Sequence, residues 1–247
     1  MRVAFSPCPN DTFLFAHYIA ETGVEPTIAD IQELNELALT HEYDLIKVSC
    51  ALLPLPPYRV LPVGAAIGYG CGPLLISRSP FPLTDLPTKR VAIPGKSTTA
   101  HLLLDRVAPA PRAKHFLPYH EILEAVEQGA VDAGVIIHEQ RFTYQERGLH
   151  LIADLGALWN GPVPLGCLLA KPQLAATLTE ALQRSLEAAY KKPPLAYMQT
   201  HAQELSPAVI QKHVDLYVAE ETRQLSPAGV QAISRLIKKP SQEWLWS

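Results

Sequence analysis

The chain has 247 residues, of which 48% are hydrophobic and 18% are charged, and its formal net charge is −3. This composition is typical of a globular protein that buries a large core in one domain or two. The slightly acidic balance argues against a nucleic-acid partner, and no run approaches the ~18 consecutive apolar residues of a membrane span. We therefore expect neither nucleic acid nor a membrane as a partner.

The cysteines and the start of the chain bear on location. Because the first expected strand begins near residue 2, there is no room for a signal peptide, and we expect a cytoplasmic protein. Cys8, Cys50, Cys71 and Cys167 lie far apart, with no C-x-x-C pair and no histidine at zinc-finger spacing. They are expected to be thiols in a reducing compartment, with no metal bound.

The first twenty residues organise the predicted site. The apolar run at residues 3–5 predicts a buried strand, which ends where Pro7 and Pro9 remove backbone donors. Asn10 or Asp11 is then expected to cap the helix that follows. A strand, a polar turn and a helix N-terminus direct backbone N–H groups at one point, which in open α/β sheets is where ligands bind. The alternative is an ordinary connection between a strand and a helix.

Strands and helices continue to alternate through the middle of the chain. Strands are expected at 26–29, 43–48, 63–67, 74–77, 90–94, 114–117, 131–137, 149–153 and 165–170, and helices at 31–40, 101–107 and 121–128. Ser49 follows the strand at 43–48 and so has a ligand position of its own. The glycine-rich run at 68–73 allows close backbone packing, but no helix follows it, which argues against a dinucleotide-binding loop.

A second strand, loop and helix N-terminus is expected over residues 90–107. Its loop, GKSTTA at 95–100, is rich in hydroxyl groups and resembles a phosphate-binding loop only superficially. The anion held at this helix N-terminus could equally be a carboxylate. The alternative is that Ser97 or Thr98 only caps the helix.

A histidine follows the strongest predicted strand. Residues 131–137 (VDAGVII) read as a buried strand, and His138 comes directly after it. A histidine at the carboxyl end of a strand, in a chain with two anion-type loops, is a candidate general base. The alternative is a structural histidine. A tight loop is expected at 155–164, which contains Trp159, Pro162 and Pro164.

The last third of the chain is predicted to be helical. Helices are expected at 174–190, 193–201, 208–221 and 228–238. The pairs Ser206-Pro207 and Ser226-Pro227 are typical of a helix cap followed by proline at the first helical position. The tail at 244–246 is expected to dock either on a groove of its own chain or on a second copy, which would make a homodimer.

The order of the elements predicts two α/β lobes. Extended connections near 74–77 and 165–170 flank a central block of strands and helices, so the chain leaves one lobe, builds another and returns. We assign residues 1–76 and 168–247 to the first lobe and 77–167 to the second. The strand-end loops would then face one ligand cleft across a hinge, which is the plan of type II periplasmic binding proteins.

The stretch at residues 6–13, SPCPNDTF, resembles the N-terminal motif of the 1,4-dihydroxy-6-naphthoate synthase family. Further similarity lies at 48–49, 70–73, 95–100, 134–139, 158–166 and 213–217, so the resemblance covers nearly the whole chain. It implies a carbon–carbon lyase of the futalosine route to menaquinone, with no metal or organic cofactor. Such an enzyme converts cyclic dehypoxanthinyl futalosine, a small carboxylate, to 1,4-dihydroxy-6-naphthoate and releases a three-carbon fragment.

Roles for individual residues follow from this resemblance as hypotheses. The family's proposed catalytic histidine falls on His138, which would take a proton from a sugar-derived carbon. The expected substrate-binding residues are Thr98, Thr99 and Ala100 for the carboxylate or a sugar hydroxyl, Asn10, Asp11 and Ser49 for the sugar-derived ring, and Trp159, Pro162 and Pro164 as a wall for the aromatic part. Asp11 could instead be only a helix cap.

Two other functions are compatible with the same fold. A chorismate dehydratase of the same pathway would carry out a different elimination, and the Cys8-Pro9-Asn10-Asp11 motif favours the synthase. A solute-binding protein without catalytic activity is the second alternative. The missing signal peptide and the histidine at a strand end argue against it.

Overall fold

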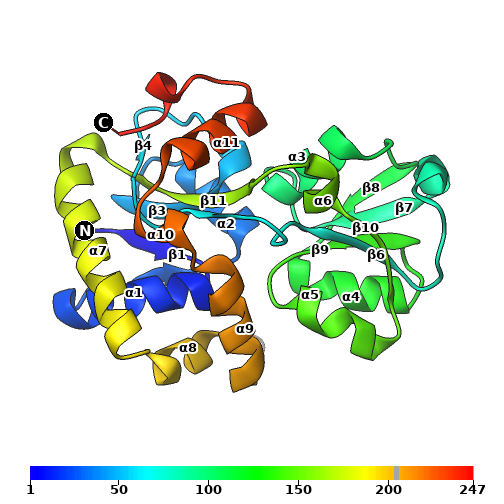
Figure 1. Ribbon diagram of the computed structural model, residues 1–247, viewed down its shortest axis with the longest axis horizontal. Helices are drawn as coiled ribbons and strands as arrows, with labels where there is room; N and C mark the ends of the chain where they lie inside the picture. The colour runs from blue at the N-terminus through cyan, green and yellow to red at the C-terminus, as the bar shows by residue number, and fades with distance from the viewer. Residues whose placement is uncertain (203–205, 247) are drawn as a thin grey trace. The chain divides into compact units, whose positions relative to one another are not determined.

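The computed structural model describes residues 1–202 and 206–246 and is shown in Figure 1. The chain forms two compact units, a first unit of Met1–Gly68 with Pro164–Ser247 and a second unit of Tyr69–Val163. The boundaries at 68/69 and 163/164 lie earlier than those drawn from the sequence, at 76/77 and 167/168. Strand pairing explains both differences, because residues 74–77 pair within the sheet of the second unit and residues 166–170 pair within that of the first.

The first unit is built on a six-stranded mixed sheet. Its strands are β1 (Val3–Phe5), β2 (Thr27–Ile28), β3 (Leu45–Ser49), β4 (Arg59–Val60), β5 (Ala66–Gly68) and β11 (Val163–Ala170). The order is β2-β1-β3-β11-β4, and β5 pairs with β11. β1 is parallel to both β2 and β3, whereas β11 runs antiparallel to β3.

Helices and a buried apolar core complete the first unit. The helices are α1 (Pro9–Thr22), α2 (Ile31–Ala38), α7 (Ala175–Lys191), α8 (Leu195–His201), α9 (Pro207–Tyr217), α10 (Glu220–Arg223) and α11 (Pro227–Ile237). α1 packs along α7, and the rings of Phe5 and Phe15 stack with centroids 4.2 Å apart. Each fully buried side chain of this kind stabilises the fold by about 1.5–3 kcal/mol. This packing fixes the position of the first turn of α1.

The second unit is built on a five-stranded sheet of order β10-β6-β9-β7-β8. Its strands are β6 (Leu74–Ser77), β7 (Arg90–Ile93), β8 (Ala113–Phe116), β9 (Ala133–Ile136) and β10 (His150–Asp154), and its helices are α3 (Thr99–Val107), α4 (Tyr119–Glu127), α5 (Gln140–Thr143) and α6 (Leu155–Trp159). β7 is parallel to both β8 and β9, and β6 is antiparallel to β9 and β10. In Figure 1, α3 and α6 lie on one side of this sheet, and α4 and α5 lie on the other.

Three local expectations are wrong, each for a physical reason. The N-cap residue of α1 is Cys8, and not Asn10 or Asp11, because Pro9 already occupies the first helical position. The helix expected at 208–221 is two helices, α9 and α10, because backbone and side-chain bonds hold Thr222 against the β5 region. The loop expected at 155–164 contains α6, because Asp154 caps its first turn by accepting from the N–H groups of Gly156 and Ala157, and β11 begins at Val163.

Two segments near the C-terminus agree with the sequence-based predictions. Ser226 caps α11 by accepting from the backbone N–H of Gly229, as its Ser-Pro pair predicts. The C-terminal tail docks on its own chain, the first of the two alternatives. The N–H of Val60 donates to the carbonyl of Trp244, the N–H of Trp246 donates to the carbonyl of Val60, and the Trp244 side chain is buried.

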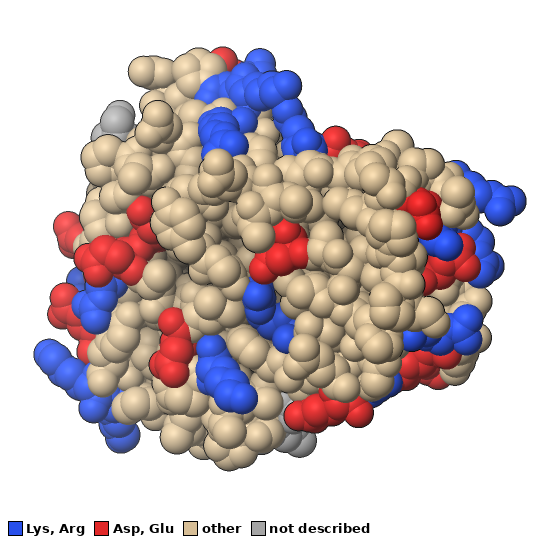
Figure 2. All heavy atoms as spheres, turned by 45° about the vertical axis from the view of Figure 1, so that its right-hand side comes forward, with Lys and Arg blue, Asp and Glu red and all other residues tan. Residues whose placement is uncertain are grey.

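The surface carries both signs of charge. On the face shown in Figure 2, the Lys and Arg side chains of the described residues are interspersed with Asp and Glu side chains. None of the described helices is both long and apolar enough to cross a bilayer.

Candidate functional site

The carboxyl ends of β7 and β9 bring two predicted site segments to one edge of the second sheet. The two strands are parallel neighbours, with Val91 opposite Ala133. The loop that leads into α3 follows β7, and His138 follows β9. The amino end of β6 and the carboxyl end of β10 reach the same edge. We call this the β7–β9 edge, and it places Thr98, Thr99 and Ala100 beside the chain segment that carries His138.

The N-terminus of α3 is built by a hydroxyl cap. Thr98 accepts from the N–H of His101 at 3.2 Å and donates to the carbonyl of Gly95 at 2.9 Å, which confirms the capping alternative for this residue. Gly95 has φ 149°, a conformation that side chains rarely allow. Thr99 and Ala100 form the buried first turn. Because the Thr98 hydroxyl is used by the cap, an anion here would be held by the helix N-terminus itself.

A histidine holds the preceding loop in shape. Nδ1 of His101 donates to the carbonyl of Lys96 at 2.8 Å, and Nε2 lies 2.9 Å from Nζ of Lys114 and 3.3 Å from Oδ2 of Asp105. A carbonyl can only accept, so Nδ1 carries the proton of the hydrogen bond to Lys96. Lys114 also pairs with Asp105 on α3. The loop is therefore tied to the helix that it caps.

His138 has a strained backbone and a supported ring. Its φ of 57° lies in the left-handed region, which non-glycine residues seldom adopt and which is common at functional positions. The half-buried imidazole packs edge-on against the ring of Tyr119, with centroids 4.9 Å apart. Gln140 then donates from Nε2 to the carbonyl of Tyr119 at 2.9 Å. The segment after β9 is thus held from α4, which orients the imidazole.

The glycine-rich run packs against α6. A Cβ on Gly72 would lie 2.6 Å from the Cα of Gly156, a distance that no side chain tolerates. Nη1 of Arg141 donates to the carbonyl of Gly72 at 2.8 Å. The run therefore serves the close backbone packing that the sequence predicts.

The three predicted wall residues do not share one loop. Trp159 ends α6, is buried and donates from Nε1 to the carbonyl of Pro162 at 3.2 Å. Pro164 lies inside β11 and belongs to the first unit. Trp159 and Pro162 therefore form one local structure, and Pro164 belongs to another.

The first unit has a comparable edge, where β1 and β3 end side by side. Ser6 follows β1, and Ser49 ends β3 opposite Gly166 of β11. Asn35 of α2 donates from Nδ2 to the Ser49 hydroxyl at 3.1 Å and accepts from the Ser49 N–H at 2.8 Å. The sequence analysis did not single out Asn35. Its signal was a polar residue on the buried face of an amphipathic helix.

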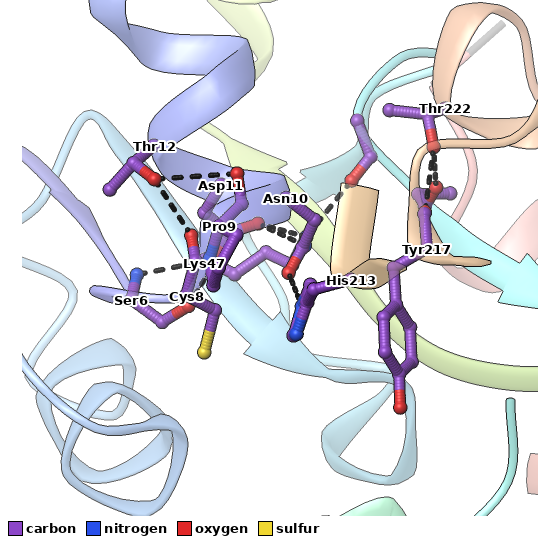
Figure 3. A network of polar contacts seen from close by, with 12 residues as sticks. Ser6, Cys8, Pro9, Asn10, Asp11, Thr12, Lys47, His213, Tyr217 and Thr222 are labelled. Carbon is purple, nitrogen blue, oxygen red and sulfur yellow. Dashed lines mark hydrogen bonds and ion pairs between the residues drawn. The ribbon is translucent and has the colours of Figure 1, made fainter. Parts of the chain in front are cut away.

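Asp11 is the centre of a buried polar network, shown in Figure 3. Oδ1 accepts from Nζ of Lys47 at 2.7 Å and from Nδ2 of Asn10 at 2.9 Å. Oδ2 accepts from the hydroxyl of Ser6 at 2.6 Å and from its N–H at 3.3 Å. Both carboxylate oxygens are therefore engaged inside the protein. Asp11 holds the turn and the Asn10 amide in place.

His213 of α9 extends this network from the far end of the chain. Its Nε2 lies 3.0 Å from Oδ1 of Asn10, across 203 residues of sequence, and its ring packs against Tyr217 with centroids 4.3 Å apart. Sequence reasoning assigned no role to Lys47 or His213. Lys47 did carry a signal, since a lysine within the apolar run LIKV needs a buried partner.

All four cysteines are buried. Burial raises the pKa of the Cys50 thiol well above its ordinary value, and neighbouring Cys167 raises it further. Among the described residues, no three His, Cys, Asp or Glu side chains are arranged to hold a metal ion.

Known proteins resemble this chain over nearly its full length. A family model described as menaquinone biosynthesis matches residues 1–242. The 1,4-dihydroxy-6-naphthoate synthase of Streptomyces coelicolor is 41% identical, with 99% of this chain and 94% of the relative covered. The enzyme of the same name from Thermus thermophilus is 42% identical, with 96% and 92% covered. The chain therefore belongs to this menaquinone-biosynthesis family, as the motif at 6–13 predicts.

Solved structures confirm the expected fold class. A protein of Archaeoglobus fulgidus has a TM-score of 0.87 and 30% identity, covering 96% of this chain and 95% of its own. The alkanesulfonate-binding protein of Xanthomonas axonopodis pv. citri has a TM-score of 0.71 and 16% identity, covering 95% and 90%. The chain is thus an α/β protein with the fold of periplasmic solute-binding proteins, and its 41–42% identical relatives are named as enzymes.

Proposed function

We propose that the protein is a 1,4-dihydroxy-6-naphthoate synthase. It would convert cyclic dehypoxanthinyl futalosine to 1,4-dihydroxy-6-naphthoate in the cytoplasm, as a carbon–carbon lyase that releases a three-carbon fragment without a metal or organic cofactor. The full-length relatives of that name support the proposal. The observation that carries it is the β7–β9 edge, where a histidine packed against Tyr119 and a helix N-terminus follow neighbouring parallel strands.

His138 is the proposed base. The reaction needs a proton removed from a sugar-derived carbon beside a carbonyl, and a neutral imidazole suits that step. The left-handed backbone and the edge-on contact with Tyr119 hold the ring in one orientation. Orientation of this kind lowers the entropic part of the barrier. Aromatisation of the product supplies the driving force.

The remaining groups bind the substrate. The first turn of α3, through Thr99 and Ala100, would hold the carboxylate on backbone N–H groups. Thr98 supports that turn as its cap. In the first unit, Asn10 and Ser49 are the proposed hydrogen-bonding groups for the sugar-derived ring, and Asp11 positions Asn10. Trp159 and Pro162, with Pro164 of β11, are the proposed contacts of the aromatic part.

Turnover by matched histidine variants tests the proposal. The purified full chain is incubated with cyclic dehypoxanthinyl futalosine, and the naphthoate chromophore is followed for wild type, His138→Ala and His120→Ala. His120 is an exposed histidine on α4, 50% accessible, and serves as the control. We expect product from wild type and the control, and a loss of about 10²–10⁴-fold in kcat/KM for His138→Ala, the range for a general base.

The other outcomes separate the alternatives. Equal product from all three proteins would keep the reaction and remove His138 as the base. If the wild type leaves this substrate unchanged but consumes chorismate, the protein is a chorismate dehydratase. Inactivity on both compounds, with binding of either one, would indicate a solute-binding protein.

A further inference from the structure

A hydrogen-bonded network of four side chains in the first unit connects a buried ion pair to a half-buried amide. Lys47 of β3 pairs with Asp11, Asp11 accepts from Asn10, and Asn10 faces His213 of α9. Figure 3 shows Asn10 between the carboxylate and the imidazole. Lys47, Asp11 and His213 are buried, and Asn10 is the most exposed of the four. The network thus leads outward to the Asn10 amide.

The charges of Lys47 and Asp11 determine which atom donates in each hydrogen bond of this network. Asp11 is paired with the ammonium of Lys47, so its carboxylate is ionised and can only accept. The Asn10 group that faces Asp11 must therefore be the NH₂ group, which leaves Oδ1 toward His213. Since Oδ1 can only accept, Nε2 of His213 must carry the proton and donate.

We propose that His213 is a positioning residue that orients the Asn10 amide for substrate binding. Two hydrogen bonds, one from Nδ2 to Asp11 and one from His213 to Oδ1, fix the amide plane. The second N–H of Nδ2 and the second lone pair of Oδ1 then have fixed directions, as a donor and an acceptor for vicinal hydroxyl or carbonyl oxygens of the sugar-derived ring. This inference rests on the proposed function, in which Asn10 contacts the substrate.

The surroundings of His213 support an orienting role. The other buried side chains of α9 nearby are apolar or aromatic, Ile210, Val214 and Tyr217. An apolar residue would fill this position without the cost of burying a polar ring. The imidazole supplies what those residues lack, a donor aimed at Oδ1. The Tyr217 ring packs against the imidazole at 38° and restricts its rotation.

Two substitutions separate donation from packing. The side-chain amide of glutamine in His213→Gln reaches a position close to that of Nε2 and can donate, whereas His213→Met fills the space without a donor. We expect His213→Gln to keep kcat/KM within about threefold of wild type, because the hydrogen bond survives. We expect His213→Met to lose about 10–100-fold, as for other supporting hydrogen bonds and small misplacements. His17→Met, on a half-buried histidine that contacts the carbonyl of Lys192, is the matched control and should retain activity.

A double-mutant cycle asks whether the effect passes through Asn10. If it does, Asn10→Ala combined with His213→Met is no worse than Asn10→Ala alone. Multiplicative losses would overturn the proposal, because the two residues would then act independently. Equal damage from His213→Gln and His213→Met would also overturn it, and would point to proton transfer or packing at this position.

A measurement without substrate keeps this inference distinct from the proposed function. Long-range ¹H–¹⁵N correlation on the protein labelled at histidine nitrogen reports which ring nitrogen carries the proton. We expect the proton of His213 on Nε2 in wild type and a changed signal in Asn10→Ala. A proton found on Nδ1 would overturn the orienting role even in an active enzyme. If wild type shows the Nε2 proton but no turnover, the proposed function fails together with the substrate-binding part of the inference, and the network itself stands.

Discussion

The two units present polar groups at the carboxyl edges of their sheets by different means. In the first unit, side chains hold one another: the ion pair of Asp11 and Lys47 anchors Ser6 and Asn10. In the second unit, backbone conformation holds the polar groups in place, through the left-handed residue His138 and the capped turn of α3. The comparison teaches that the first edge depends on buried charge, whereas the second depends on local dihedral angles.

Removal of the buried cation should have the largest effect on stability. In Lys47→Met, the carboxylate of Asp11 stays buried without its counter-ion, and we expect a loss of about 3–5 kcal/mol in the free energy of unfolding. Urea denaturation measures this loss. Adding Asp11→Asn in the same chain should recover part of it, because the buried charge is then gone. A loss below about 1 kcal/mol, the range of surface pairs, would contradict a dry ion pair.

The left-handed backbone of His138 allows a test in the second unit, with a smaller expected effect on stability. Glycine adopts φ 57° without a steric penalty, and alanine does not. We therefore expect His138→Gly to be more stable than His138→Ala by about 1 kcal/mol, while both lack the proposed base. Thermal unfolding of the two variants gives the difference. Equal stability would show that the left-handed conformation carries no strain.

The partly exposed ion pair of Arg90 and Asp132, at the opposite edge of the second sheet, can be compared with the buried pair of Lys47 and Asp11. Hydrogen bonds from Arg90 lower the pKa of Asp132 from 3.8 to about 2. A carboxyl whose folded pKa is lowered stabilises the fold above its unfolded pKa, so this contribution is complete above about pH 4 and is lost as the pH falls toward 2. The pair is partly exposed to solvent, so we expect Asp132→Asn to cost only about 0.2–1 kcal/mol at pH 6.

The pH dependence checks that assignment. Unfolding free energies of wild type and Asp132→Asn should differ at pH 6 and converge as the pH approaches 2. A difference that stays constant over this range would mean that the substitution acts through packing and not through the charge.

Much of the fold was predictable because its signals are local. The strand, turn and helix over the first twenty residues, the capped loop before α3 and the Ser226-Pro227 cap depend on residues within a few positions of one another. The N-cap of α1 and the division between α9 and α10 were not predictable in the same way. For α1, Cys8, Asn10 and Asp11 are all possible N-cap residues within four positions. For α9 and α10, the break depends on the hydrogen bond from the Thr222 hydroxyl to the carbonyl of Ala65, which is distant in sequence.

The sequence by itself determined the class of fold, the strand-end position of His138 and, through the motif at 6–13, the family. Only the tertiary structure decided which side chains Asp11 and Asn10 contact. The parallel pairing of β1 with β3 brings Lys47 to Asp11, and the packing of α9 brings His213 to Asn10. Hydrogen bonds between residues so distant along the chain have no local signal, because sheet register and helix packing create them.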